Sequence, residues 1–242
     1  MKQLREVLAK GTIAEQQGAL TVLTANPSAD ADALVEEWLD RLAAGKAPPE
    51  LMVEIEEAAG ASKSERIRRR LAGYEKALAQ MSEFSPTDDL LRFRSALAGG
   101  DAENGRTLFH TKAAAECQRC HKLDGQGGEV GPPLNGVGKQ TREYLLESIV
   151  LPNKAIAKGY ESVLITTLDG KTVSGVLKSE DDKEVRLMTA EGKLVTVKKA
   201  DIDDRRATKS AMPDDLAGKL TKRELRDLVE FLSGLKEEWK KP

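Results

Sequence analysis

The sequence predicts a mainly α-helical protein that carries one small antiparallel β segment in its second half. Three patterns lead to this prediction. In residues 1–81, apolar side chains recur at helical spacing through several successive segments. From about residue 159 to 203, apolar and polar side chains alternate instead, as they do in half-buried strands. After this segment, TKRELRDLVEFLSGLKEEW returns to the helical spacing.

The composition is that of a globular protein of 242 residues, which is long enough for two small domains that each bury a core. The net charge is −2, from 38 basic and 40 acidic residues spread along the chain. This balance gives no basic surface for nucleic acid, so we expect no nucleic-acid partner. We also expect no transmembrane segment, because no run of about 18 apolar residues is present.

Residues 1–86 are expected to form a helical domain. The segment TIAEQQGALTVLTA places Ile13, Leu20 and Leu23 on one helix face. The next segment, NPSADADALVEEWLDRLAAGK, repeats this pattern with Leu34, Val35, Leu39 and Leu42. ELMVEIEEAAG and SERIRRRLAGYEKALAQ continue the series. Successive short helices of this kind favour a HEAT-like or bundle arrangement, although no strict repeat period is present.

Residues 87–242 are expected to form a second domain, after a linker at residues 82–89. DDLLRFRSALA is predicted to be a helix, and a new helix then starts with Asp101 as its N-cap. A further helix, TREYLLESIVLPN, is capped by Thr141 and closed by Pro152.

Three or four antiparallel strands are expected within the β segment, at about residues 159–203. Asp169-Gly170 is a strong hairpin turn, and Glu191-Gly192 separates two further strand-like runs.

The segment CQRCHKLDGQGGEVGPPLNGVG contains both cysteines of the chain and one of its two histidines. Cys117, Cys120 and His121 form the motif C-x-x-C-H, which is typical of covalent attachment of c-type haem. Two thiols three positions apart can form thioethers with the two vinyl groups of one porphyrin, and the adjacent imidazole can ligate the iron. The motif therefore predicts one covalently bound haem c.

Three other interpretations of the motif are less favoured. A dithiol redox site usually belongs to a βαβ unit, whereas this motif ends a helical segment. A zinc site needs about four protein ligands, and His110 is the one further histidine that could join the three. A disulfide between residues three positions apart would constrain the chain little.

The surroundings of the motif resemble class I cytochromes c. GRTLF places Gly105 and Phe109 as in the N-terminal helix of that family, and RDLVEFL resembles its C-terminal helix. The resemblance implies that Leu228 and Phe231 cross Gly105 and Phe109, where the glycine permits a close approach of the two helices. These residues would belong to the haem pocket or its support.

The sequence GPPL, which follows the motif, resembles the Gly-Pro-x-Leu loop of class I cytochromes c. The resemblance implies that the carbonyl of Pro132 accepts a hydrogen bond from the His121 imidazole. Such a bond would fix the orientation of the ring and increase its basicity as a ligand. Leu134 would then pack against the porphyrin.

A sixth ligand of the iron is expected from one of the five methionines. Met212 lies in KSAMPDDL shortly before the last helix, as the distal ligand does in class I cytochromes c. Met188 alternates within a predicted strand, which favours a core position, and the helical position of His110 favours a surface or core role. Ligation by His121 and Met212 would leave no open position on the iron, and this favours electron transfer.

The β segment between His121 and Met212, with GYESVLITTLDGKTVSGVL, resembles the haem-binding domain at the C-terminus of large planctomycete and verrucomicrobial proteins. In those proteins helical repeats precede the cytochrome domain, and a dehydrogenase-like β-propeller often lies farther upstream. The resemblance implies that the chain is the C-terminal part of a larger, membrane-bound dehydrogenase-like protein. It also implies a periplasmic or other extracytoplasmic location, with an export signal outside this chain.

The predicted function is that of an electron-transfer domain that is not itself an enzyme. It would pass single electrons from a redox partner or an upstream dehydrogenase domain to a downstream acceptor. Two alternatives stay open. One is a haem-based ligand-binding or peroxidase-like enzyme, if Met212 can leave the iron. The other is a helical interaction module in which the haem is structural.

Overall fold

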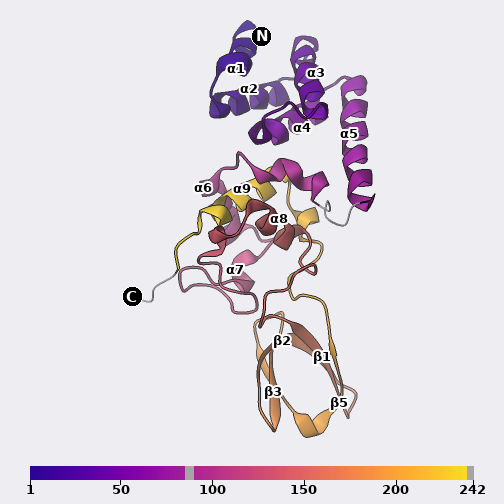
Figure 1. Ribbon diagram of the computed structural model, residues 1–242, viewed down its shortest axis with the longest axis vertical. Coiled ribbons are helices and arrows are strands. Elements are labelled where there is room, and N and C mark those ends of the chain that lie inside the picture. Colours follow the sequence, from indigo (N-terminus) through magenta and orange to yellow (C-terminus); the bar gives the residue numbers. More distant parts are fainter. Residues whose placement is uncertain (85–89, 239–242) are drawn as a thin grey trace.

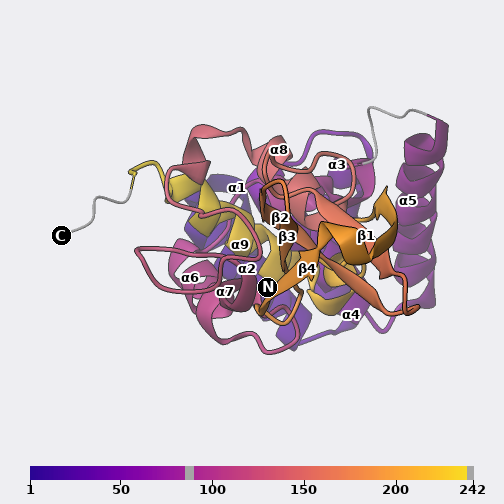
Figure 2. The same ribbon diagram turned by 90° about the horizontal axis from the view of Figure 1, so that it is seen from below.

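The computed structural model describes residues 1–84 and 90–238. Three groups of elements follow one another along the long axis of the molecule (Figure 1). Helices α1 to α5 lie at one end, a second helical group with α6 to α9 lies in the middle, and a β-sheet lies at the other end. Each group has its own hydrophobic core of buried side chains. Viewed from the sheet end, the strands lie in front of α8 and α9, and α5 lies at one side (Figure 2).

The first group confirms the helical prediction for the N-terminal part of the chain. Its elements are α1 (Lys2–Lys10), α2 (Ile13–Ala25), α3 (Ala29–Ala43), the 3-10 helix η1 (Pro49–Leu51), α4 (Met52–Ala61) and α5 (Glu65–Phe84). Thr12 and Glu15 form a capping box that starts α2, and Ser28 caps α3. All four apolar residues expected on the inner face of α3 are buried. Ile13 was expected beside Leu20 and Leu23 but is 37% exposed, because it stands at the first position of α2, outside the packed turns.

The second group surrounds the cysteine motif. Its elements are η2 (Leu91–Leu97), α6 (Ala102–Thr111), α7 (Cys117–Cys120), η3 (Val137–Lys139), α8 (Arg142–Val150), η5 (Leu216–Lys219) and α9 (Lys222–Gly234). The caps expected from the sequence are present, since Asp101 accepts hydrogen bonds from two amides of α6 and Thr141 accepts one from α8. In the described part of DDLLRFRSALA, which was expected to be an α-helix, Leu91–Leu97 instead form a 3-10 helix, a short form that is common in connectors.

The third group is a five-stranded antiparallel sheet in the order β4-β3-β2-β1-β5. The strands are β1 (Ser162–Thr167), β2 (Thr172–Glu180), β3 (Glu184–Met188), β4 (Leu194–Lys198) and β5 (Ile202–Ala207). The sequence prediction of three or four strands ending near residue 203 was one or two strands too few. IDDRRA of β5 has no alternating pattern, and its strand depends on pairing with β1, which is distant in sequence. Both predicted turns are present, with Gly170 and Gly192 at positive φ.

The linker expected at residues 82–89 is only partly described. Helix α5 extends to Phe84, so the first three of these residues are helical. Residues 85–89, and with them the expected domain boundary between residues 86 and 87, lie outside the described residues.

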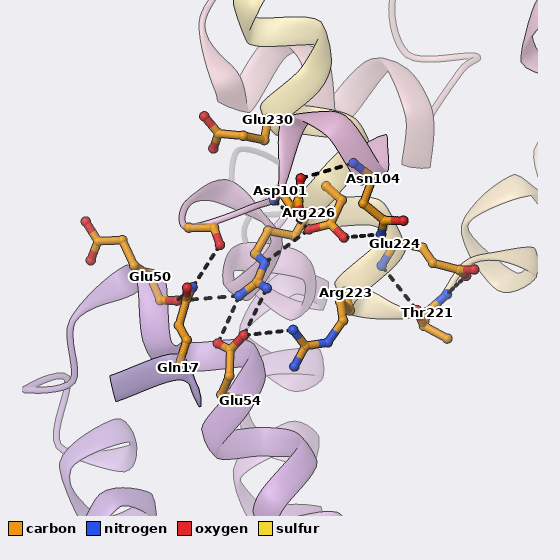
Figure 3. A network of polar contacts seen from close by, with 12 residues as sticks. Gln17, Glu50, Glu54, Asp101, Asn104, Thr221, Arg223, Glu224, Arg226 and Glu230 are labelled. Atoms are coloured by element: carbon orange, nitrogen blue, oxygen red, sulfur yellow. Dashed lines mark hydrogen bonds and ion pairs between the residues drawn. The ribbon is translucent and has the colours of Figure 1, made fainter. Parts of the chain in front are cut away.

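The two helical groups are joined by polar side chains between α4 and α9 (Figure 3). Arg226 of α9 donates to both carboxylate oxygens of Glu54 on α4. Arg223 of α9 lies 3.0 Å from the same carboxylate. From α2, Gln17 donates to the carbonyl oxygens of Glu50 and Gly99, at 2.9 and 2.8 Å. The first group is therefore in direct contact with α9 and with the segment that leads into α6.

Candidate functional site

A largely apolar cavity in the second helical group contains the residues that the sequence singled out. Its volume is about 190 Å³. Its walls include Cys117, Cys120, His121 and Met212. These four residues come from two segments far apart in the sequence, and the fold brings them to one cavity.

The two cysteines lie on one short helical turn. Glu116 takes a left-handed conformation with φ 48°, which turns the chain into α7. The α7 turn then places Cys117 and Cys120 three positions apart, on neighbouring parts of its surface. Both cysteines are free thiols. The arrangement presents two thiols from one turn to the same cavity.

His121 follows directly and is held by the next loop. Its Nδ1 lies 2.8 Å from the carbonyl oxygen of Pro132. Since a carbonyl only accepts, Nδ1 carries the proton in this bond, and Nε2 is left unprotonated and able to bind a metal. Burial of the ring lowers the pKa of His121, while the bond to Pro132 acts in the opposite direction. Burial therefore favours the neutral imidazole, which is the form that binds a metal.

Glycines let the loop pass close to the motif. A Cβ on Gly131 would come within 2.5 Å of His121 Cε1, and one on Gly128 would overlap the carbonyl oxygen of Arg119. The loop is also bonded to the motif backbone, because Gly131 N donates to Cys120 O at 2.8 Å and Gly128 N to Gln118 O at 3.0 Å. The Gly/Pro-rich run after the motif thus packs His121 in place from one side.

Met212 reaches the cavity from the loop that precedes η5 and α9. It is the one methionine among the five that lines the cavity, and all five lie within the described residues. Met52 is buried in the first helical core, and Met188 lies in β3 opposite Val176. Met1 and Met81 are 45% and 57% exposed.

His110, the rival ligand considered from the sequence, lies on the exposed side of α6 and does not line the cavity. Its ring instead contacts that of Phe109, with centroids 5.1 Å apart.

The other predicted pocket residues divide into two sets. Phe109, Leu134 and Leu228 line the cavity together with Pro132. Gly105 and Phe231 are not among the lining residues and instead form the crossing of α6 with α9.

At this crossing, a Cβ on Gly105 would overlap the carbonyl oxygen of Asp227. The rings of Phe109 and Phe231 lie 5.8 Å apart. The crossing is next to the cavity, because Phe109 belongs to the crossing and also lines the cavity wall.

Several wall residues were missed by sequence reasoning. They are Tyr144, Leu145 and Ile149 of α8. Their only sequence signal is the apolar spacing of α8, which does not say whether its inner face meets a core or a cavity. Their side chains make this part of the wall predominantly apolar.

The donor atoms at the cavity fit a covalently held haem better than a zinc site or a reactive dithiol site. Within residues 1–84 and 90–238, no group of three or more His, Cys, Asp or Glu side chains could hold a metal ion, which disfavours a zinc site. Burial raises the pKa of the Cys117 thiol to about 11, whereas reactive redox thiols have a lowered pKa. The apolar cavity is lined by two thiols, an imidazole and the sulfur of Met212. These groups match the attachment and ligation of haem c.

The comparison with protein families agrees with this donor set. Residues 102–164 match the family model of cytochrome c, whereas no curated protein matches the chain. The matched segment runs from α6 into β1 and includes the cysteine motif and Pro132, but it ends before Met212 and α9. The match supports a cytochrome c domain, and hence a haem-binding protein of electron transfer with covalently bound haem c. No helix in the described part of the chain is long and apolar enough to span a membrane.

Proposed function

We propose that this chain is a cytochrome with one covalently bound haem c, ligated by His121 and Met212, that carries single electrons between redox partners. The observation that carries the proposal is the meeting of Cys117, Cys120, His121 and Met212 at one apolar cavity. A haem bound there supplies a reversible one-electron couple of the iron.

The roles of the side chains follow from their positions. Cys117 and Cys120 would hold the group through two thioethers, while His121 and Met212 would be its axial ligands. Pro132 orients the imidazole through the hydrogen bond to Nδ1. With the iron held by both His121 and Met212, no side chain would need to act as acid, base or nucleophile.

The wider context belongs to the same proposal. Residues 1–86 would form a HEAT-like helical domain, and residues 87–242 a class I-like cytochrome domain of the planctomycete and verrucomicrobial type with the sheet inserted. The electron donor would be an upstream dehydrogenase domain or a separate redox protein. The location would be periplasmic or otherwise extracytoplasmic.

Covalent attachment is tested by expressing the chain in cells that mature c-type cytochromes. After extraction with acidic acetone, the polypeptide is denatured in alkaline pyridine, reduced, and its visible spectrum recorded. We expect one haem per chain that stays with the polypeptide and has both vinyl groups saturated, and we expect loss of this haem in the Cys117→Ser, Cys120→Ser variant. A colourless wild-type polypeptide would refute the proposal.

Axial ligation is tested by Met212→Ala, with Met81→Ala as a control at an exposed methionine. We expect Met212→Ala alone to let the iron bind added imidazole and to lower the midpoint potential. If the wild-type iron binds external ligands as readily as Met212→Ala, the ligand-binding or peroxidase-like alternative is favoured instead.

A further inference from the structure

The sheet is inserted into the second helical group by two stems that lie together. One stem is residues 153–161, which leave α8, and the other is residues 208–212, which return to the cavity. Pairing of β1 with β5 places Val163 opposite Ala207. One step farther out, Thr208 N donates to Ser162 O at 3.0 Å. The sheet therefore starts and ends at one place, and Met212 follows the last paired residue, Thr208, by four positions.

A short chain of hydrogen bonds runs from the first stem to Met212. The side-chain oxygen Oδ1 of Asn153 accepts from Ser210 N at 2.8 Å. In turn, the Ser210 hydroxyl oxygen accepts from Met212 N at 3.2 Å. Asn153 follows Pro152, which lines the cavity after the end of α8. The backbone of the methionine loop is thus hydrogen-bonded to the segment that directly follows α8.

The same sheet also contacts the loop behind His121. Lys178 of β2 donates from Nζ to Glu129 O at 2.5 Å. Its ammonium group also lies 4.7 Å from the ring centroid of Tyr160, a residue of the cavity wall. Glu129 stands three positions before Pro132, whose carbonyl oxygen is bonded to His121. The sheet and its stems therefore contact the loops of both expected ligands.

We propose that the five-stranded unit is a positioning element for Met212, with Asn153 and Lys178 as positioning residues. This inference rests on the proposed function. The methionine stands on a loop and is half-buried against the second hydrophobic core, so the contacts of its loop also determine its position. The paired stems and the bond from Asn153 restrict the loop from one side. Lys178 restricts the sheet relative to the loop of His121, so the separation of the two ligand loops is set by the sheet.

The test uses the haem-loaded chain with Asn153→Ala, and with Asn153→Asp as the variant that keeps an oxygen acceptor. Asn26→Ala, whose side chain bonds only within α2 among the contacts described, is the matched control. The readouts are the affinity of the iron for imidazole, from visible spectra, and the midpoint potential. Losing one hydrogen bond, worth about 0.5–1.5 kcal/mol, should raise imidazole affinity roughly two- to tenfold in Asn153→Ala. Asn153→Asp should restore the wild-type value.

Lys178→Met keeps the apolar stem of the side chain but removes its charge, and it should raise imidazole affinity as Asn153→Ala does. Lys178→Arg keeps the charge and should have the wild-type imidazole affinity. Lys171→Met, at the exposed turn between β1 and β2, is its control.

If Asn153→Ala lowers the unfolding temperature but leaves imidazole affinity and potential unchanged, the role of Asn153 is structural and the inference fails. The same result for Lys178→Met overturns the part assigned to the sheet. Absence of attached haem, or a Met212→Ala variant with wild-type imidazole affinity, instead refutes the proposed function itself.

Discussion

Arg226 of α9 and Glu54 of α4 form a buried, two-pronged ion pair. Each of the guanidinium nitrogens Nη1 and Nη2 lies 2.9 Å from one carboxylate oxygen. The side chains are 3% and 0% exposed. Helix α9 contacts α4 through this pair and also contributes Leu228 and Leu232 to the cavity wall. One helix therefore connects the N-terminal helices to the candidate site.

Replacing Arg226 with Met should strongly destabilise the fold, because it leaves the carboxylate of Glu54 buried with less compensation. We expect the free energy of unfolding to fall by about 3 kcal/mol or more, measured by urea denaturation. Arg5→Met, which removes an exposed ion pair with Glu37, should cost about 0–1 kcal/mol. The double variant Glu54→Leu, Arg226→Met should regain much of the loss, because no charge of the pair then stays buried alone. Equal losses for Arg226→Met and Arg5→Met would contradict this prediction.

Gly105→Ala should separate α6 from α9, since the new methyl group would overlap the carbonyl oxygen of Asp227. Backbone atoms cannot turn aside as a flexible side chain can, so we expect a loss of about 1–3 kcal/mol or more in the free energy of unfolding. Gly18→Ala is the matched control, because it lies inside α2 with no atom within 4 Å of the added Cβ. That control should stabilise the protein by about 0.5–1 kcal/mol. Urea denaturation of both variants checks the prediction, which fails if they change stability in the same direction.

Gly131→Ala should disturb the imidazole of His121 more than the fold. The added Cβ would come within 2.5 Å of Cε1 and 2.8 Å of Nδ1 of the ring. We expect a changed visible spectrum and a shifted midpoint potential in the haem-loaded protein. Gly218→Ala, with no atom within 4 Å of the added Cβ, should leave both unchanged. An unaltered spectrum in Gly131→Ala would show that the ring does not need this glycine.

The ion pair between Glu230 of α9 and Arg142 of α8 should make stability depend on pH. Hydrogen bonds from Arg142 hold the pKa of Glu230 below its ordinary value of 4.5. A carboxyl group with a lowered pKa in the folded state adds stability above its unfolded pKa and loses it as the pH falls through the folded pKa. The difference in unfolding free energy between wild type and Glu230→Gln should therefore be constant near neutral pH and shrink below about pH 4.5. Urea denaturation across pH 3–7, roughly the window that spans the carboxyl pKa values, checks this. A difference that stays constant across the whole range would contradict it.

Local patterns were sufficient to predict much of the fold. Asp101 and Thr141 were predicted as caps because their side-chain chemistry acts within three residues, and both cap their helices. The C-x-x-C-H motif was also readable, because its chemistry depends on adjacent residues. Met212 lies 91 positions after His121. Only the family resemblance could therefore predict that it shares a cavity with the three motif residues.

The features that were missed depend on distant parts of the chain. Strand β5 has a polar sequence and forms through its pairing with β1. The contact between α4 and α9 joins Glu54 to Arg226, which lie 172 positions apart. A glutamate in a helical pattern is normally assigned to the solvent side, so nothing local marks Glu54 as buried.

The junction of α4 with α9 also bears on how electrons could enter and leave. A haem seated against Leu228 and Leu232 would keep a fixed orientation relative to α1–α4, because the buried pair between Arg226 and Glu54 would have to break before the two helical groups could swing apart. A carrier that swings on a tether between donor and acceptor needs a joint that opens easily. Here the buried pair holds the two helical groups together, so redox partners of the proposed cytochrome would have to come to the cavity mouth and leave it in turn.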